Sequence, residues 1–177
     1  MKIAVFGSTG GIGKFVVKHA LEKGYEVNAY VRNPQKLQIE NKNLKVFVGQ
    51  VSDYDKIKES IKGCDAVIIA LGISMKFAHE DRSSIIAHKN IIKAMDETNV
   101  KRLIDWSTPS IKFKDDKASF ATIAPGILAS IFLPKAKKVL KEVHNIVVNS
   151  DVDWTIVRFM APKNSLFTKE IKESFGD

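Results

Sequence analysis

Three glycines, each three residues apart and directly following a short apolar run, constrain the fold more than any other feature. Lys2–Phe6 is typical of a buried strand, and from Ile12 to Lys23 the apolar residues recur at helical spacing. Glycines between a strand and a helix let the first helical N–H groups approach an anion, because no Cβ intervenes. This context predicts a loop that binds the pyrophosphate of a dinucleotide, formed by Gly7, Ser8, Thr9, Gly10, Gly11, Ile12 and Gly13.

The end of the second expected strand, Glu26–Val31, indicates which dinucleotide is bound. An NAD site usually has a carboxylate here for the ribose hydroxyls. This sequence has Arg32-Asn33-Pro34 instead. Arg32 can pair with a 2′-phosphate or stack on adenine, although a solvated turn residue is the alternative interpretation. We therefore predict NADP(H) in preference to NAD(H).

The rest of the chain alternates between short apolar runs and amphipathic stretches. Near-continuous apolar strands separated by helices indicate a parallel sheet that is covered on both faces. We predict a single α/β domain over residues 1–177, a Rossmann-type doubly wound sheet with helices on both faces. The further strands are expected at 44–48, 65–71, 102–106 and 154–158, and the further helices at 53–62, 83–98 and 135–149.

Composition narrows the possible partners. The net charge of +8 comes from lysines scattered over many segments, so a solvated basic surface is favoured and no nucleic-acid partner is expected. Cys64 is the single cysteine, which excludes an internal disulfide and indicates a buried apolar role. No spacing of histidine and carboxylate suggests a metal site. The chain begins with no signal-peptide core, so a cytoplasmic location is expected.

Residues 118–134 form an uncharged stretch that Pro125-Gly126 interrupts. It is too short to cross a membrane, so we expect no membrane partner and interpret the stretch as buried or pocket-lining. The region from Phe113 to Leu133 is predicted either to wall a substrate pocket for a planar acceptor or to form a homodimer face. The residues predicted for this wall are Phe120, Ile127, Leu128, Ile131 and Phe132.

Four segments of the sequence resemble the atypical short-chain dehydrogenase/reductases, specifically the NAD(P)H-binding, NmrA-like group that includes biliverdin reductase B, a flavin reductase. They are GSTGGIG, VRNPQKL, NIIKAMDETNVKRLIDWST and SDVDWTIVR, and together they run along nearly the whole chain. The resemblance implies that Gly49-Gln50-Val51 borders the adenine and that Ala70-Leu71-Gly72 passes the ribose and the nicotinamide. It also implies that Ser107 and Thr108 face the nicotinamide, as candidate catalytic residues.

Two departures from the family pattern matter. The family usually has aspartate at the position of Gln50. Relatives also continue with another strand and helix where this sequence stops, so we expect either a reduced substrate side or a piece of a longer protein.

The catalytic pair of the short-chain enzymes is absent from its usual place. Those enzymes use Tyr-x-x-x-Lys, in which the lysine lowers the pKa of the phenol that relays a proton. The helix expected after the fifth strand contains no tyrosine. Tyr54 and Lys58 have the spacing but lie between the third and fourth strands, so we interpret them as a chance match. The usual alcohol–ketone proton relay is therefore not expected.

Other polar residues offer weaker candidates. Ser107 and Thr108 can bind an acceptor or cap the turn before the next proline, and both interpretations stay open. His144 and Lys138 are the best remaining proton donors, although a satisfied helix histidine is favoured for the former. His79 and His88 are expected at the surface.

Two functions follow. The first is an NADPH-dependent oxidoreductase that transfers hydride to a planar conjugated acceptor, such as a flavin or quinone, without a Tyr-Lys pair. The alternative is a non-catalytic NADP(H)-binding redox sensor of the NmrA-like kind, acting through a protein partner.

Overall fold

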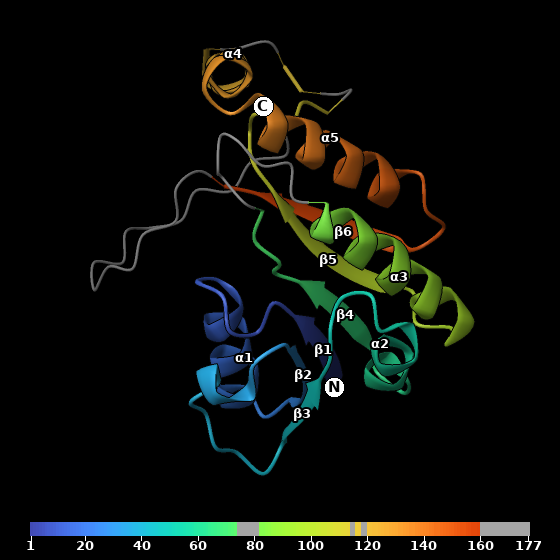
Figure 1. The fold of residues 1–177 in the computed structure, drawn as a ribbon. Helices are drawn as coiled ribbons and strands as arrows, with labels where there is room; N and C mark the ends of the chain where they lie inside the picture. The colour runs from blue at the N-terminus through green and yellow to red at the C-terminus, as the bar shows by residue number, and fades with distance from the viewer. Residues whose placement is uncertain (74–81, 114–115, 118–119, 160–177) are drawn as a thin grey trace.

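Six parallel strands form one sheet in the order β3-β2-β1-β4-β5-β6 (Figure 1). The computed structural model describes residues 1–73, 82–113, 116–117 and 120–159. The strands are β1 Lys2–Phe6, β2 Glu26–Val31, β3 Leu44–Val48, β4 Ala66–Ile69, β5 Arg102–Ser107 and β6 Asp153–Arg158. The helices are α1 Gly13–Glu22, η1 Pro34–Lys36, α2 Tyr54–Ile61, α3 Ser83–Glu97, α4 Phe120–Phe132 and α5 Pro134–Val148. The predicted Rossmann-type parallel sheet is confirmed.

The strand order reverses beside β1, which distributes the helices over two faces. Right-handed crossovers place α1 on one face and the α3 and α5 connections on the other (Figure 1). Side chains of β1 alternate accordingly. Ala4 and Phe6 pack with α2 and α3, whereas Ile3 and Val5 pack with α1. The face of α2, α3 and α5 is called the covered face below, and the face of α1 is called the open face.

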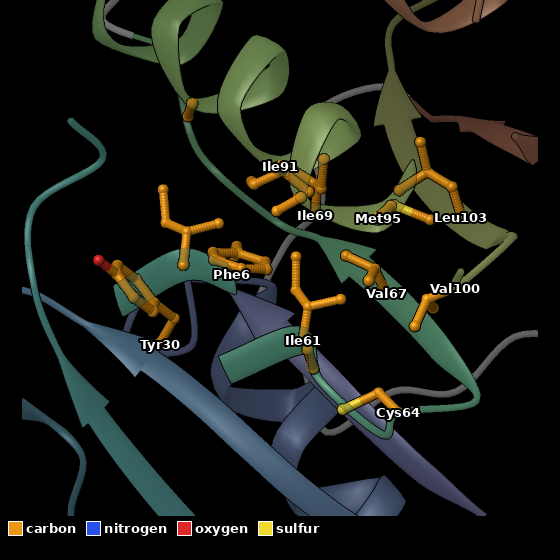
Figure 2. Packing of buried hydrophobic residues seen from close by; sticks show 14 of the residues in the cluster. Phe6, Tyr30, Ile61, Cys64, Val67, Ile69, Ile91, Met95, Val100 and Leu103 are labelled. Atoms are coloured by element: carbon orange, nitrogen blue, oxygen red, sulfur yellow. The ribbon is translucent and has the colours of Figure 1, made fainter. Parts of the chain in front are cut away.

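The covered face holds the larger part of the core. Figure 2 shows Phe6 and Ile69 of the sheet beside Ile91 and Met95 of α3. Cys64 lies in the same cluster at 7% exposure, which confirms its predicted burial. Burial raises the pKa of its thiol to about 11, so this cysteine stays protonated at neutral pH.

Helix ends lie within a few residues of the predicted positions. Gly24 and Gly63 take positive φ angles of 77° and 74° just after α1 and α2, as helix-stopping glycines do. The Asp53 side chain accepts a hydrogen bond from the Lys56 N–H and so caps α2. β4 ends earlier than predicted, at Ile69, and leaves the next residues in an irregular segment.

The uncharged stretch differs most from prediction. Helix α4 continues through Pro125 and Gly126, and it packs on α5 rather than under the sheet. Ile127 and Ile131 are 56% and 61% exposed, so for the described residues of this stretch the interpretation as buried is wrong. The pocket wall and the homodimer face stay predictions, and the side chain of Phe120 lies outside the described residues. The apolar pattern predicts a helix and an apolar face, but only the tertiary structure decides what that face contacts.

Candidate functional site

The glycine loop is tightly packed on its inner side and open on its outer side. Gly7 has a φ of 82°, and a Cβ there would lie 2.5 Å from the Ala70 carbonyl oxygen. A Cβ on Gly13 would collide with the Gly7 carbonyl, so glycine allows α1 to pack closely on β1. A Cβ on Gly11 would meet no described atom within 4 Å. The backbone is therefore held firmly while its outer side can be approached closely by a ligand.

The start of α1 has the polarity that an anion needs. Ile12 precedes the helix, and no described side chain caps its N–H groups. Ser8 is buried and donates to the Val5 carbonyl at 2.6 Å, so its hydroxyl stabilises the turn. Thr9 is half-buried beside it. The Ser8 hydroxyl is therefore engaged within the loop, and the backbone N–H groups at the start of α1 are the groups available to face an anion.

The carboxyl ends of β2 and β3 lie next to each other beside this loop. Arg32 is exposed and makes no hydrogen bond or ion pair with another described residue. Tyr30 donates its phenol O–H to the Gln50 carbonyl at 2.9 Å, and Asn90 donates to the Val51 carbonyl at 2.9 Å. These bonds fix the backbone of the predicted adenine border, and the Gln50 side chain is left exposed.

A large apolar hollow of about 900 Å³ begins at the glycine loop and extends down the open face along α1. Trp106 and Phe159 stack at the part of the hollow where β5 and β6 end, with ring centroids 5.7 Å apart and planes 14° apart. The indole N–H of Trp106 donates to the Leu71 carbonyl at 2.8 Å, which fixes the ring. The predicted site residues that line the hollow are Gly10, Gly11, Ile12, Ala70 and Gly72.

Adjacent residues of β5 point to opposite faces. Trp106 lines the hollow, whereas Ser107 is 4% exposed and lies on the covered face. Thr108 is half-buried, and its hydroxyl lies 2.5 Å from the Ser110 hydroxyl. The structure therefore brings the glycine loop and the end of β4 together at the hollow, and it leaves the Ser107 side chain on the other side of the sheet.

Comparison with known proteins gives the family. The family model described as NAD(P)H-binding matches residues 7–173.

The chain belongs to the NAD(P)H-binding family.

Relatives of this NAD(P)H-binding chain include several oxidoreductases. It is 26% identical over 175 residues to the oxidoreductase ptaF of Pestalotiopsis fici, covering 91% of this chain and 65% of that protein. It is 30% identical over 130 residues to cinnamoyl-CoA reductase 1 of Petunia hybrida, covering 68% and 39%. The chain thus spans about two thirds of the length of ptaF and well under half of the length of cinnamoyl-CoA reductase 1.

Solved structures show the same fold. A short-chain dehydrogenase/reductase from Veillonella parvula in complex with NADP superimposes with a TM-score of 0.69 at 18% identity, covering 89% of this chain and 68% of that one. ChuY, an anaerobillin reductase from Escherichia coli O157:H7, gives a TM-score of 0.69 at 16% identity, covering 89% and 72%. At such identities the likeness is one of fold.

The covered face of the NAD(P)H-binding sheet contains a buried ion pair. His88 is 2% exposed and not at the surface, so that prediction is wrong, and His79 lies outside the described residues. The His88 Nε2 lies 3.3 Å from the Asp105 Oδ2, at ion-pair distance but poorly aligned for a hydrogen bond. Its Nδ1 lies 2.6 Å from the Ser84 carbonyl oxygen. The lone histidine was missed because its partner is seventeen residues away, on β5.

The charge state of His88 follows from these neighbours. Burial lowers the pKa of its imidazole, and the Asp105 carboxylate together with the Ser84 carbonyl raises it. The attraction outweighs the desolvation, and the pKa of His88 lies above its ordinary value. The raised pKa favours the protonated form of the His88 imidazole beside Asp105, between α3 and β5.

His144 lies deeper in the structure than a surface proton donor would. Its ring meets Phe113 edge-on with centroids 4.6 Å apart, and its Nδ1 is buried without a hydrogen-bond partner in the described structure. Burial, and then the positive charge of Arg158, lowers the pKa of His144. Arg158 itself binds Asp116 in a two-bond ion pair at 2.5 Å. A neutral imidazole in this position is a weak acid at neutral pH.

The Tyr54 motif does not form a catalytic pair. Lys58 binds Glu97 at 2.6 Å, and Lys93 lies 4.5 Å over the Tyr54 ring. Burial, and then Glu97, raises the pKa of Tyr54 to about 12, opposite to what a proton relay needs. Among the described residues, no group of three or more histidines, cysteines and carboxylates could hold a metal ion. No helix in that part of the chain is long and apolar enough to cross a membrane.

Proposed function

We propose that this chain is an NADPH-dependent reductase that passes hydride to a planar conjugated acceptor, such as a flavin or quinone. The observation that carries the proposal is the apolar hollow that begins at the glycine loop and contains the Trp106–Phe159 stack where β5 and β6 end. Planar acceptors bind well against fixed aromatic rings in apolar surroundings. A reductase of the biliverdin and flavin type, within the NmrA-like group, fits this arrangement.

The residues present fit an NADP(H) molecule. The open side of Gly11 and the uncapped start of α1 suit a pyrophosphate, and Arg32 stands exposed where a 2′-phosphate would lie. No carboxylate follows β2 to hold the ribose hydroxyls instead. When bound, the nicotinamide supplies the hydride of the reaction.

The chain itself positions the acceptor on an apolar surface and is not expected to donate a proton to it. The Trp106 ring is fixed by its bond to Leu71, so it can orient an acceptor near the end of β4. The lowered pKa of His144 makes it a poor proton donor, and α5 has no tyrosine. An acceptor that takes its proton from water is therefore favoured over a ketone or aldehyde.

The direct test is NADPH oxidation, followed at the absorbance of the reduced nicotinamide, with FMN, riboflavin, menadione and biliverdin as acceptors. We expect turnover with at least one of these acceptors and none with simple ketones. A Trp106→Leu variant should raise the KM for the acceptor while the NADPH dissociation constant stays unchanged. Failure of the whole panel, in protein that binds NADPH, would refute the reductase proposal.

Arg32 provides the test of cofactor preference. In Arg32→Ala we expect NADPH binding to weaken roughly 10- to 100-fold, the value of a charge-assisted hydrogen bond, with NADH binding unchanged. Lys36→Ala, an exposed basic residue of the following η1 helix, is the matched control and should change neither. Equal losses for NADPH and NADH would remove Arg32 from the 2′-phosphate role.

A second candidate is a nucleotide-binding regulator without catalysis. It is favoured by the burial of Ser107, the position predicted to act on the nicotinamide, on the face away from the hollow. This candidate predicts that calorimetry detects NADP⁺ binding while no acceptor supports turnover. A measurable kcat with any acceptor that scales with the enzyme concentration would exclude it.

A further inference from the structure

The described part of α4 exposes several large apolar side chains between Ile123 and Phe132. Ile123, Ile127 and Ile131 form one row at a spacing of four residues, and Leu128 and Phe132 form the adjacent row. These five residues, called the α4 stripe, are between 39% and 63% exposed. The other side of the helix is held to α5, because the Lys137 ammonium donates to the Gly126 carbonyl and to the Ser130 hydroxyl, each at 2.7 Å.

Lysines flank the α4 stripe in the sequence. Residues 112–141 contain seven lysines and two aspartates, and α4 itself carries no charge. Lys112 and Lys117 precede the helix, and three exposed lysines lie on the first turns of α5: Lys135, Lys138 and Lys141. Asp116 is neutralised by Arg158, and Glu142, which follows the last of these lysines, is paired with Arg82.

This combination favours one kind of occupant. A second copy docked by a two-fold axis would bring the flanking lysines of two chains together, and each chain carries a net charge of +8. An anionic lipid surface instead accepts both features, since acyl chains receive the stripe while headgroup phosphates meet the lysines. A 13-residue helix is too short to span a bilayer, so it would lie in the plane of the interface.

We propose that α4 is an interfacial helix that docks this protein on anionic membranes, with the α4 stripe at the acyl boundary. The inference is independent of the nucleotide site, and it departs from the expectation that the chain has no membrane partner. The stripe and the hollow are formed by different elements, so the proposal does not depend on what binds at the glycine loop.

The test is co-sedimentation of the full chain with vesicles of phosphatidylcholine alone and of phosphatidylcholine with phosphatidylglycerol. We expect binding to the anionic vesicles, weakened by added salt because the lysine contribution is screened. Ile127→Asp with Ile131→Asp should weaken it at least roughly tenfold. Lys112→Glu with Lys141→Glu should weaken it by at least roughly 25-fold, at about fivefold for each lysine lost.

Matched controls carry the same changes elsewhere. Ile86→Asp alters a 45%-exposed isoleucine on α3, and Lys42→Glu with Lys62→Glu removes two exposed lysines distant in sequence from α4. Both controls should bind vesicles like the wild type, and every variant should keep the wild-type Tm. Size-exclusion chromatography with light scattering then measures the mass of each variant in solution.

Three results would overturn the proposal. The first is an absence of vesicle binding, and the second is equal binding to neutral and anionic vesicles. The third is a dimer that Ile127→Asp with Ile131→Asp dissociates, which would show that a second copy covers the α4 stripe.

Discussion

Adjacent residues of one strand point to opposite faces of the sheet, and the two faces differ in how closely those side chains are packed. On the covered face, three helices bury an ion pair and a close-packed core, with His88 and Asp105 both nearly inaccessible. On the open face, α1 packs beside a hollow of about 900 Å³ lined by side chains of β1, β4 and β5. One strand can therefore serve stability with every second residue and leave the others for a ligand.

The largest expected effect is at His88. Its substitution by leucine leaves the Asp105 carboxylate buried without its positive partner; among the described residues the Trp106 N–H, at 2.8 Å, still donates to it. Breaking a buried pair in this way should cost about 3–5 kcal/mol of the free energy of unfolding, measured in urea at neutral pH. His19→Leu, on α1 at the rim of the hollow, is the matched control and should change stability by less than about 0.5 kcal/mol.

The double variant His88→Leu with Asp105→Leu separates the charge from the packing. Replacing both partners by apolar residues of similar size removes the unpaired carboxylate, so stability should return to within about 1 kcal/mol of the wild type or exceed it. If the double variant were as unstable as His88→Leu alone, packing rather than the unpaired charge would explain the loss.

The next effect is a pH dependence that arises on the covered face. Because the folded-state pKa of His88 is raised, its stabilisation is complete below the unfolded-state pKa of about 6.5 and is lost as pH rises through the folded-state value. The unfolding free energy of the wild type should therefore decline above pH 6.5, by at most about 1.4 kcal/mol per pH unit. The double leucine variant should lack this decline, and His19→Gln should retain it. A flat wild-type profile would contradict the assigned charge state.

The comparison of the two faces also separates the features that the sequence predicts from those that it does not. The glycine loop and the β1–α1–β2 unit follow from local patterns, since the periodicity and the turn residues lie within a short stretch of chain. The opening at Gly11 and the crowding at Gly13 agree with the roles expected of a pyrophosphate loop. Arg32 also lies exposed at the end of β2, where the strand pattern placed it.

The features that the sequence does not predict depend on contacts between segments that are distant along the chain. His88 is unremarkable until the sheet brings β5 against α3, and an apolar helix such as α4 has the same pattern whether its apolar side is buried or exposed. The hollow is likewise invisible in the sequence, because alternation within β5 indicates two faces but not which of them a helix covers. Ser107 illustrates this limit, since its place at the end of β5 predicts a residue near a ligand but not the face to which its side chain points.

The smallest expected effect tests whether the open face is open in solution. Ile69 is 1% exposed on the covered face, and its neighbour Ile68 lines the hollow, so Ile→Val removes the same methyl group on either side of β4. Ile69→Val should cost about 1 kcal/mol of unfolding free energy, and Ile68→Val less than half as much, because a partly exposed methyl group loses less contact. Equal losses would mean that Ile68 is as closely packed as Ile69 and that the hollow is filled. A smaller loss at Ile68 that grows when NADPH and an acceptor are added would instead place the ligand against this face.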